Sequence, residues 1–554
     1  MSVGKRAPRS IDVAPAVSTR SGGALAGTAT LVRVILRRDR VRLSAWLVGV
    51  VGFLTVSALS VPEVYPTAAE RQVRGDFVQS PVLTIFSGPG YGADDYTVGA
   101  MVANEYLIYG LVTVALMSIF LVVRHTRAEE EAGRVELVRA SVAGAHAAPS
   151  AALLVAVAAN LLIGAVTALV LTISLEELPA TGSVAFGLSM AAAGVVFATV
   201  AAVSAQVTQH SRGATGLAVG VLAVTFLLRA AGDIGDGRAL SWASPIGWAQ
   251  STRPYVDERW WPLLVSGVAA AVLAVAAYAL ASRRDVGAGL IAPRPGPTVA
   301  SRWLAHPTGL ALRLQRASLI AWLVGLASFG AVFGSLLGEV EEFLAENPQL
   351  QEFFGAGENG ALVDAFLGTV MLLLGLLATG FATSAALRSR SEEGHGRAEP
   401  LLATALSRRR WAGSHLVVAL GGGTLVMLGA ATGVGLAASL ERGEVTWLAD
   451  MLGAGAAHLP AMWLTVAVVA ALYGTAPRVA SWGWIVVVYA AVVGLMGDPL
   501  GMPDWARVLS PFHHVPQLPG DEVGLGALLA LTLAAIALVA VGLAGFRRRD
   551  INAV

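Results

Sequence analysis

The chain has 554 residues, of which 55% are hydrophobic and 14% are charged, and its formal net charge is +1. Soluble domains carry about a quarter charged residues, so this composition excludes an ordinary soluble protein and predicts a membrane protein. The absence of cysteine excludes disulfides, thiolate metal sites and thiol nucleophiles.

Residues 1–30 are rich in Ser, Gly, Ala and Pro and contain no sustained apolar run. We expect a disordered cytosolic leader without a cleavable signal peptide, because the first apolar run starts late and is long. The single lysine, Lys5, lies in this leader and is followed by Arg6. A phosphate-binding loop needs a lysine followed by Ser or Thr, so we predict no ATPase site of this type on the chain.

Twelve apolar runs follow, each close to the roughly 20 residues that a membrane-spanning helix needs. Six lie in each half, so both halves are predicted to have the same orientation, as parallel rather than inverted repeats. The expected fold is therefore an all-α polytopic membrane protein. The predicted spans are 43–62, 101–123, 149–173, 184–206, 214–231, 261–281, 317–338, 362–387, 413–438, 447–473, 479–497 and 523–546.

Several landmarks recur in the same order in the two halves. Arg212 and Arg478 lie between the fourth and fifth spans, and an Arg-Arg-Asp sequence closes each half at 283–285 and 548–550. We therefore interpret the chain as two copies of one membrane unit joined by a linker rich in Pro and Gly. The predicted domains are the leader at 1–30, the units at 31–290 and 311–554, and the linker at 291–310.

The sharpest repeat is a charged segment between the second and third spans of each half. It reads TRAEEEAGRVELVRA at 126–140 and SRSEEGHGRAEPLLA at 389–403, in constant register because 389 − 126 = 263. We predict that the recurring residues face a cytosolic partner. They are Arg127, Glu129, Glu130, Gly133, Arg134 and Glu136 in the first copy, and Arg390, Glu392, Glu393, Gly396, Arg397 and Glu399 in the second.

The order of residues in these segments favours a helix. A hydroxyl residue opens each one, with Glu three positions later, which matches a capping box. We predict one short helix per segment that exposes its carboxylates and docks on the partner, with Pro400 ending or kinking the second helix. Gly133 and Gly396 are unfavourable in mid-helix, which indicates another backbone close by. The alternative is a solvent-exposed loop that is helical but only connects the two spans and binds no partner.

Arginine placement sets the predicted orientation, because cytosolic loops of membrane proteins carry an excess of Lys and Arg. With the leader inside, the cytosolic segments hold 30 of the 38 Lys and Arg residues, and both termini are cytosolic. The stretches 29–42 and 308–316 mix aliphatic residues with arginine just before the first span of each half. They are predicted to lie in the inner membrane interface or to be ordinary flanking charge.

Other features concern the spans and the outer loops. The loops at 232–260 and 498–522 combine Trp, Pro and small residues, and we interpret them as short external helices that dip towards the bilayer. Two Gly-x-x-x-Gly motifs, at 216–220 and 429–433, predict close helix crossings.

Few ionisable residues fall within the spans. We interpret Glu105, Arg229 and Asp364 near outer ends, and His415 near an inner end, as interfacial or paired charges rather than proton relays. Neither HExxH nor CxxC occurs, so we predict no catalytic or metal-binding residue, and nothing indicates a nucleic-acid partner.

Six spans per unit, a basic stretch before the first, a charged segment after the second and a broken loop before the sixth resemble the permease of ABC-2 type exporters, of type V architecture. The fused double form, with the two charged segments quoted above, resembles actinobacterial exporters of polyketide antibiotics, the tetronasin-type permeases. The resemblance covers the chain from about residue 30 onward. The second copy departs from the first at Gly394-His395-Gly396 and Pro400, which makes two unequal docking sites an expectation.

The resemblance implies that the twelve recurring residues couple this chain to an ABC ATPase that is encoded separately.

ATP and Mg would be bound by that partner, expected as a homodimer beneath one copy of this chain, and the chain itself would need no cofactor. Substrates would be amphipathic small molecules moved outward.

The expected function is therefore the permease subunit of an ATP-driven multidrug or antibiotic efflux transporter in a bacterial plasma membrane, working by alternating access. One alternative is a self-sufficient, proton-coupled secondary drug transporter with twelve spans. Another is a membrane-embedded scaffold or sensor whose charged segments dock a regulator.

Overall fold

The computed structural model describes residues 23–79, 81–139, 143–234, 239–285, 287–291, 296, 298–338, 359–496, 502–520 and 524–550. These residues form helices and loops and contain no strand. Twelve candidate membrane spans are long and apolar enough to cross a bilayer, which confirms the all-α polytopic fold. Most of the predicted leader, residues 1–22, lies outside the described residues.

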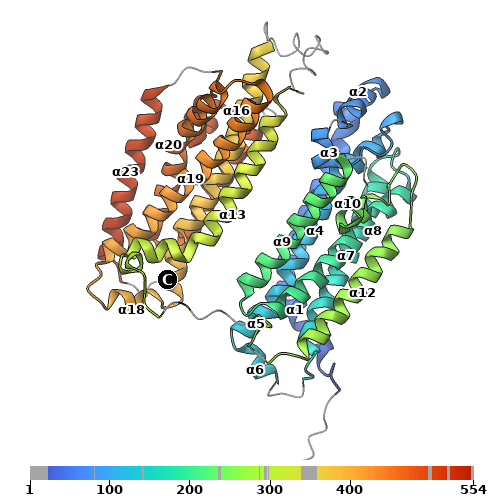
Figure 1. Ribbon diagram of the computed structural model, residues 1–554, viewed down its shortest axis with the longest axis horizontal. Helices are drawn as coiled ribbons and strands as arrows, with labels where there is room; N and C mark the ends of the chain where they lie inside the picture. Colours follow the sequence, from blue (N-terminus) through green and yellow to red (C-terminus); the bar gives the residue numbers. More distant parts are fainter. Residues whose placement is uncertain are drawn as a thin grey trace, which may run out of the picture. The chain divides into compact units, whose positions relative to one another are not determined.

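The chain divides into two compact units, residues 1–295 and 296–554, which are called unit 1 and unit 2 below (Figure 1). Each unit contains six of the candidate spans. In unit 1 the spanning helices are α1 (Thr28–Val64), α4 (Val98–His125), α7 (Ala147–Ser174), α8 (Ala180–Val207), α9 (Ser211–Ile234) and α12 (Trp261–Ala281). Its shorter helices are α2 (Ala68–Val78), α3 (Pro81–Ser87), η1 (Ala93–Asp95), α5 (Arg127–Glu131), α6 (Arg134–Arg139), α10 (Ala239–Trp242) and α11 (Pro245–Gln250).

Unit 2 repeats this order of long helices. Its spans comprise α13 (Pro307–Ser335), α16 (Asn359–Ala386), α19 (Arg408–Arg442), α20 (Thr446–Thr475), α21 (Gly483–Met496) and α23 (Leu525–Arg548). Its shorter helices are η2 (Arg302–Ala305), α17 (Arg388–Gly394), α18 (Ala398–Leu402), η3 (Pro477–Trp482), α22 (Asp504–Val508) and η4 (Pro511–His514).

The basic stretches before the first span of each unit are continuous with that span. α1 runs for 37 residues and includes 29–42, and α13 runs for 29 residues and includes 308–316. A 37-residue helix is about 55 Å long at about 1.5 Å per residue, whereas the hydrocarbon core is about 30 Å thick. The basic start of α1 therefore extends well beyond the length that the hydrocarbon core requires.

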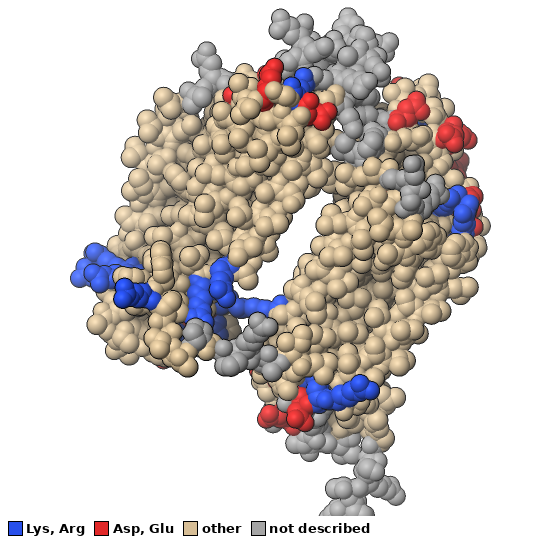
Figure 2. Space-filling model, viewed as in Figure 1, with Lys and Arg blue, Asp and Glu red and all other residues tan. Residues whose placement is uncertain are grey.

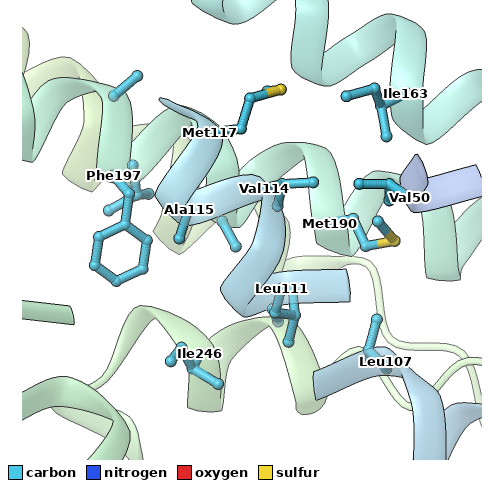
Figure 3. Packing of buried hydrophobic residues seen from close by; sticks show 14 of the residues in the cluster. Val50, Leu107, Leu111, Val114, Ala115, Met117, Ile163, Met190, Phe197 and Ile246 are labelled. Carbon is cyan, nitrogen blue, oxygen red and sulfur yellow. The ribbon is translucent and has the colours of Figure 1, made fainter. Parts of the chain in front are cut away.

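The core of unit 1 is centred on α4 and α8, the two most buried of its spans. Leu111 and Met117 of α4 and Phe197 of α8 are fully buried in this cluster (Figure 3). Between helices in lipid, close packing rather than removal of apolar surface from water supplies the stability. Gly164 and Gly187 allow such packing between α7 and α8, since a Cβ on either would overlap the carbonyl oxygen of the other.

The two Gly-x-x-x-Gly motifs behave differently. In unit 2 a Cβ on Gly429 or Gly433 would collide with α13, at the Leu323 side chain or the Ala327 carbonyl oxygen, so the predicted close crossing is confirmed there. In unit 1 the glycines at 216 and 220 have nothing within 4 Å of a Cβ among the described residues. The predicted close crossing is therefore not found within unit 1, because α9 turns this face away from the other described helices of its unit.

The outer loops before the last span of each unit do contain short helices, α10 and α11 in unit 1 and α22 and η4 in unit 2. The Ser244 hydroxyl caps α11 by accepting hydrogen bonds from the amides of Ile246 and Gly247 at 3.2 and 3.5 Å. The sequence analysis did not anticipate α2 and α3, which lie between the first two spans of unit 1.

Two charges near the outer ends are paired, as interpreted from the sequence. Glu105 binds Arg74 at 2.9 Å. Arg229 is fully buried, lies 3.4 Å from Asp233 and donates hydrogen bonds to the carbonyl oxygens of Thr84 and Ile85. These carbonyls belong to the last turn of α3, where helix carbonyls lack partners within the helix. Arg229 thus anchors α3 to α9.

Charged side chains lie mainly towards the ends of each unit on the face shown in Figure 2, and the long middle part is nearly free of them. This distribution is typical of a chain whose middle part faces hydrocarbon. The charged ends are therefore the places to look for polar chemistry.

Candidate functional site

Each charged segment folds as two short helices rather than one. α5 and α6 are separated by Gly133, and α17 and α18 by Gly396, with φ angles of 72° and 69°. A residue with a Cβ is strained at such angles by about 1–2 kcal/mol. A Cβ at either glycine would meet nothing within 4 Å. The glycines therefore serve a left-handed turn. No described backbone of this chain approaches them, and the close approach of a partner's backbone stays a prediction.

The predicted capping boxes are also wrong. The Thr126 hydroxyl donates to the carbonyl oxygen of Val122 at 2.6 Å, and the Ser389 hydroxyl donates to that of Ala386 at 2.9 Å. Each segment follows its span almost without interruption, so the hydroxyl bonds back into the preceding turn instead of capping a free helix start. Pro400 lies in the first turn of α18 and does not end it, because no intrahelical partner is needed for an amide there.

The first acid of each pair bridges the glycine turn. Glu129 accepts from Arg134 Nε at 2.5 Å and Nη2 at 3.1 Å, and Glu392 accepts from Arg397 at 2.6 and 3.2 Å through the same atoms. The hydrogen bond and charge of Glu129 raise the pKa of the Arg134 guanidinium. The two copies therefore share one bidentate bridge that holds the turn closed.

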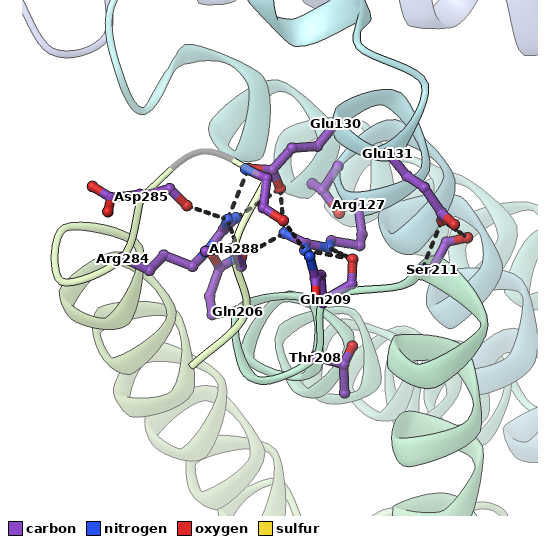
Figure 4. A network of polar contacts seen from close by, with 12 residues as sticks. Arg127, Glu130, Glu131, Gln206, Thr208, Gln209, Ser211, Arg284, Asp285 and Ala288 are labelled. Carbon is purple, nitrogen blue, oxygen red and sulfur yellow. Dashed lines mark hydrogen bonds and ion pairs between the residues drawn. The ribbon is translucent and has the colours of Figure 1, made fainter. Parts of the chain in front are cut away.

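The second acid of each pair is held inside its own unit. Glu130 binds Arg284 through two contacts at 2.7 and 2.8 Å, and Glu393 binds Arg549 through two at 2.7 and 2.5 Å (Figure 4 shows the first pair). Their side chains are 8% and 2% exposed. We call these two pairs the buried clamps. The expectation that every carboxylate of the segments is exposed is therefore wrong.

The buried clamps tie each charged segment to the end of its unit. Arg284 and Arg549 are the second arginines of the Arg-Arg-Asp sequences that follow α12 and terminate α23. Glu130 also accepts from the Gly287 amide at 2.9 Å, and Glu393 accepts from the Tyr473 hydroxyl at 2.5 Å. Removing one partner of such a buried pair leaves an uncompensated charge, which is strongly destabilising.

The first arginine of each segment holds the loop between the fourth and fifth spans. Arg127 is 1% exposed and donates to the carbonyl oxygens of Gln209, Gly287 and Ala288 at 2.5–3.0 Å (Figure 4). Arg390 donates to the Ser481 hydroxyl at 3.1 Å and to the Arg478 carbonyl at 3.2 Å. Each segment is therefore fixed to two other parts of its unit.

The remaining recurring residues face solvent. Gly133, Arg134 and Glu136 are exposed in unit 1, and Gly396, Arg397 and Glu399 are exposed in unit 2. We call residues 133–136 and 396–399 the exposed corners. Glu136 and Glu399 form no ion pair among the described residues. The structure thus separates the recurring residues into two groups. Those up to the second Glu are buried or half-buried, and those in the pattern Gly-Arg-x-Glu are exposed.

Sequence reasoning missed a buried acid close to this site. Asp39 of α1 is 2% exposed and lies 2.6 Å from His125 Nε2 and 3.3 Å from Arg124. Asp39 is the single acid within the arginine-rich stretch 33–42, and this could have identified it from the sequence. Matching Trp46 with Trp322 places Gln315 at the corresponding position of unit 2, where its amide nitrogen has no hydrogen-bond partner among the described residues.

Comparison with known proteins gives two findings. Residues 304–547 match the family described as the C-terminal domain of the multidrug efflux system permease Rv1217c. Over 535 residues, the chain is 42% identical to the multidrug efflux system permease protein Rv1217c of Mycobacterium tuberculosis, and the match covers 96% of each chain. The similarity therefore extends over both units.

Proposed function

The chain belongs to the family of the multidrug efflux system permease Rv1217c, and from this premise we propose that it is the membrane subunit of an ATP-driven efflux transporter. As a twelve-helix permease it is a multi-pass protein of the bacterial cell membrane. We propose that a separate ABC ATPase homodimer binds ATP and Mg, and that amphipathic compounds of the polyketide-antibiotic kind are exported by alternating access.

The observation that carries this proposal is the matched pair of exposed corners. Each presents a guanidinium and a carboxylate two residues apart on a turn that Gly133 or Gly396 makes. A membrane protein with two equivalent corners fits a partner with two equivalent grooves, such as an ATPase dimer. The single lysine, Lys5, lacks the sequence of a phosphate-binding loop, which supports nucleotide binding on another chain.

The mounting of the corners suits them to transmit movement. In unit 1 the segment continues α4, is tied to the loop before α9 by Arg127, and is tied to the end of α12 by the clamp of Glu130 with Arg284. A partner that pushes the corner therefore acts on three spans at once. Rigid packing of this kind converts a local shift into a movement of whole helices.

The test combines transport with charge reversal at the corners. The chain is co-expressed with an ABC ATPase from the same genome, and uptake of a fluorescent drug into inside-out vesicles is measured. We expect uptake that requires ATP and persists when a protonophore removes the proton gradient. Uptake driven by the proton gradient without ATP would overturn the proposal and favour a secondary transporter.

The variant Arg134→Glu with Arg397→Glu should reduce co-purification of the ATPase and uptake together, because both corners then repel the groups they attract. Arg283→Glu with Arg548→Glu is the matched control, since both arginines are exposed and neighbour the clamps without belonging to the corners. Normal ATPase binding by the corner variant would contradict the docking role.

A further inference from the structure

A small chamber lies behind the charged segment of unit 1, at the predicted cytosolic end. Its volume is about 290 Å³, and it is lined by both members of the clamp, Glu130 and Arg284, with His146, Ala148 and Ala281. The chamber combines a neutralised ion pair with small side chains. It is therefore a polar space that borders the element proposed to couple to the ATPase.

A larger apolar groove of about 660 Å³ adjoins this chamber, and His146 lines both. Residues of α7, α8 and α12 form its walls, among them Leu153, Val195 and Ala270. Its polar groups include the Tyr278 hydroxyl, which lies 2.8 Å from the Ser150 hydroxyl, while the Tyr278 ring packs edge-on against His146. The chamber and the groove thus share one wall residue, and together they offer a polar end and an apolar body.

The groove lies at the depth of the inner leaflet. Residues 270–278 precede the end of α12 at Ala281 by 3 to 11 positions, which corresponds to about 5–17 Å along the helix. Half of the hydrocarbon core is about 15 Å thick. A molecule in the groove with its polar end in the chamber would therefore be oriented as it is in the inner leaflet.

Unit 2 fills the corresponding space with aromatic rings. The register of 263 matches Ala148 with Trp411, and the matched Arg-Arg-Asp sequences match Ala281 with Phe546. Trp411 and Phe546 are 2% and 1% exposed, and their rings stack with centroids 5.5 Å apart. The chamber of unit 1 thus lies where two alanines match two large rings of unit 2. The space is open in one unit and filled by side chains in the other.

The chemistry of the lining residues restricts which molecules can bind in this site. All three nitrogens of the Arg284 guanidinium are already engaged, by Gln206 and Ala288 as well as by the Glu130 carboxylate. Nη2 donates to Glu130 alone, so a phosphate head group would find at most one further N–H of this guanidinium and would face a carboxylate. The Nδ1 atom of His146 is buried and has no hydrogen-bond partner among the described residues. The polar end of the site accordingly suits a neutral or weakly basic group that forms one hydrogen bond.

We propose that the chamber and groove of unit 1 bind a neutral or weakly basic amphipathic small molecule that enters from the inner leaflet. This inference rests on the proposed function and assigns a passenger site to unit 1 alone. The polar group of the bound molecule would lie beside Glu130 and Arg284. This clamp joins the exposed corner, which is proposed to face the ATPase, to the end of α12.

The test fills the chamber of unit 1 as unit 2 is filled, by Ala148→Trp with Ala281→Phe. The protein is assembled with its ATPase in nanodiscs, and binding of the weakly basic dye Hoechst 33342 is measured by fluorescence titration. We expect binding to weaken about tenfold or more, since overpacking of an occupied space is unfavourable. Stimulation of ATP hydrolysis by the dye should be lost.

Two further variants make the outcome decisive. Val272→Phe adds similar bulk to α12 at a position that is 62% exposed and outside the site, and should leave dye binding unchanged. His146→Ala removes the shared polar group without adding bulk, and should weaken dye binding several-fold even if the filled variant folds poorly. Unchanged dye binding in the filled and His146 variants would overturn the proposal.

A lipid occupant is distinguished by native mass spectrometry. A phospholipid that wild type retains and the filled variant loses, with dye binding unchanged, would overturn the proposal in favour of a structural lipid. The dye titration does not depend on hydrolysis or export. Failure of the proposed function, with no ATP-dependent uptake by wild type, is therefore distinguishable from failure of the passenger site.

Discussion

The charged segments of the two units share a buried clamp and an exposed corner, but they differ in the other hydrogen bonds that hold them to the unit. In unit 1 Glu131 accepts hydrogen bonds from the Ser211 amide and hydroxyl at 2.9 and 2.5 Å. The register of 263 matches Glu131 with Gly394, and the match of Arg212 with Arg478 aligns Ser211 with Pro477. Unit 2 thus lacks the acid and both donors together. The shared features are those that the proposed common partner would require, whereas the contacts of Glu131 are found in unit 1 alone among the described residues.

The same contrast continues behind the clamps. Glu393 lies against the Tyr473 hydroxyl in a cluster that also contains Trp411 and Phe546, whereas Glu130 borders the chamber. One clamp is therefore enclosed by aromatic rings, and the other adjoins the chamber.

The clamps should differ in how much stability they supply. Glu393→Ala should lower the free energy of unfolding by about 3–5 kcal/mol, because Arg549 is left as a buried unpaired charge. Glu130→Ala should cost more, since it removes the carboxylate from Arg127, which is 1% exposed, as well as from Arg284. SDS-titrated unfolding in mixed micelles measures both. An equal or smaller loss at Glu130 would show that the chamber lets water reach the arginines that Glu130 leaves.

The aromatic filling of unit 2 should be required for its stability. Trp411→Ala should cost about 3–5 kcal/mol, because truncation of a buried large side chain leaves a cavity. Ala148→Trp in unit 1 should cost clearly less, since the chamber already offers the volume. The same unfolding assay applies, and a comparable loss for the two substitutions would show that the chamber cannot accept a ring.

The glycine turns should behave alike in both units. Gly133→Ala and Gly396→Ala should each cost about 1–2 kcal/mol, because the left-handed φ angle strains a residue with a Cβ. Gly216→Ala, in the exposed middle of α9, is the control and should be neutral or stabilising by up to about 1 kcal/mol. If the losses in the free energy of unfolding for Gly133→Ala and Gly396→Ala differed by more than about 1 kcal/mol, the two turns would not be equivalent.

The support by Glu131 should have the smallest effect. Glu131→Gly should cost about 1 kcal/mol, because two hydrogen bonds at a partly exposed site are lost. The reverse change, Gly394→Glu, should add no more stability than Gly394→Ala, since Pro477 has neither an amide hydrogen nor a hydroxyl to donate. A larger gain from Glu than from Ala would show that another donor replaces Ser211 in unit 2.

Much of the fold followed from the sequence. Twelve long apolar runs predict twelve spans because the bilayer demands both length and apolarity, and the constant register of the charged segments identified matched residues that do form matched contacts. Capping boxes failed for a local reason: the pattern reads Thr126 and Ser389 as helix starts, whereas in the structure each segment continues from the preceding span. A sequence pattern does not reveal whether a helix is already under way.

The amino-acid order by itself determined the membrane class, the duplication and the pairs of matched residues, because these depend on composition and spacing along the chain. Tertiary packing alone established which acid of each pair is clamped to the end of its unit, since the clamping arginines, Arg284 and Arg549, lie more than 150 residues away in sequence. It likewise decided that, among the described residues, one Gly-x-x-x-Gly motif packs within its unit and the other does not. Burial is a property of the neighbours that surround a side chain, and those neighbours are assembled only when the helices pack.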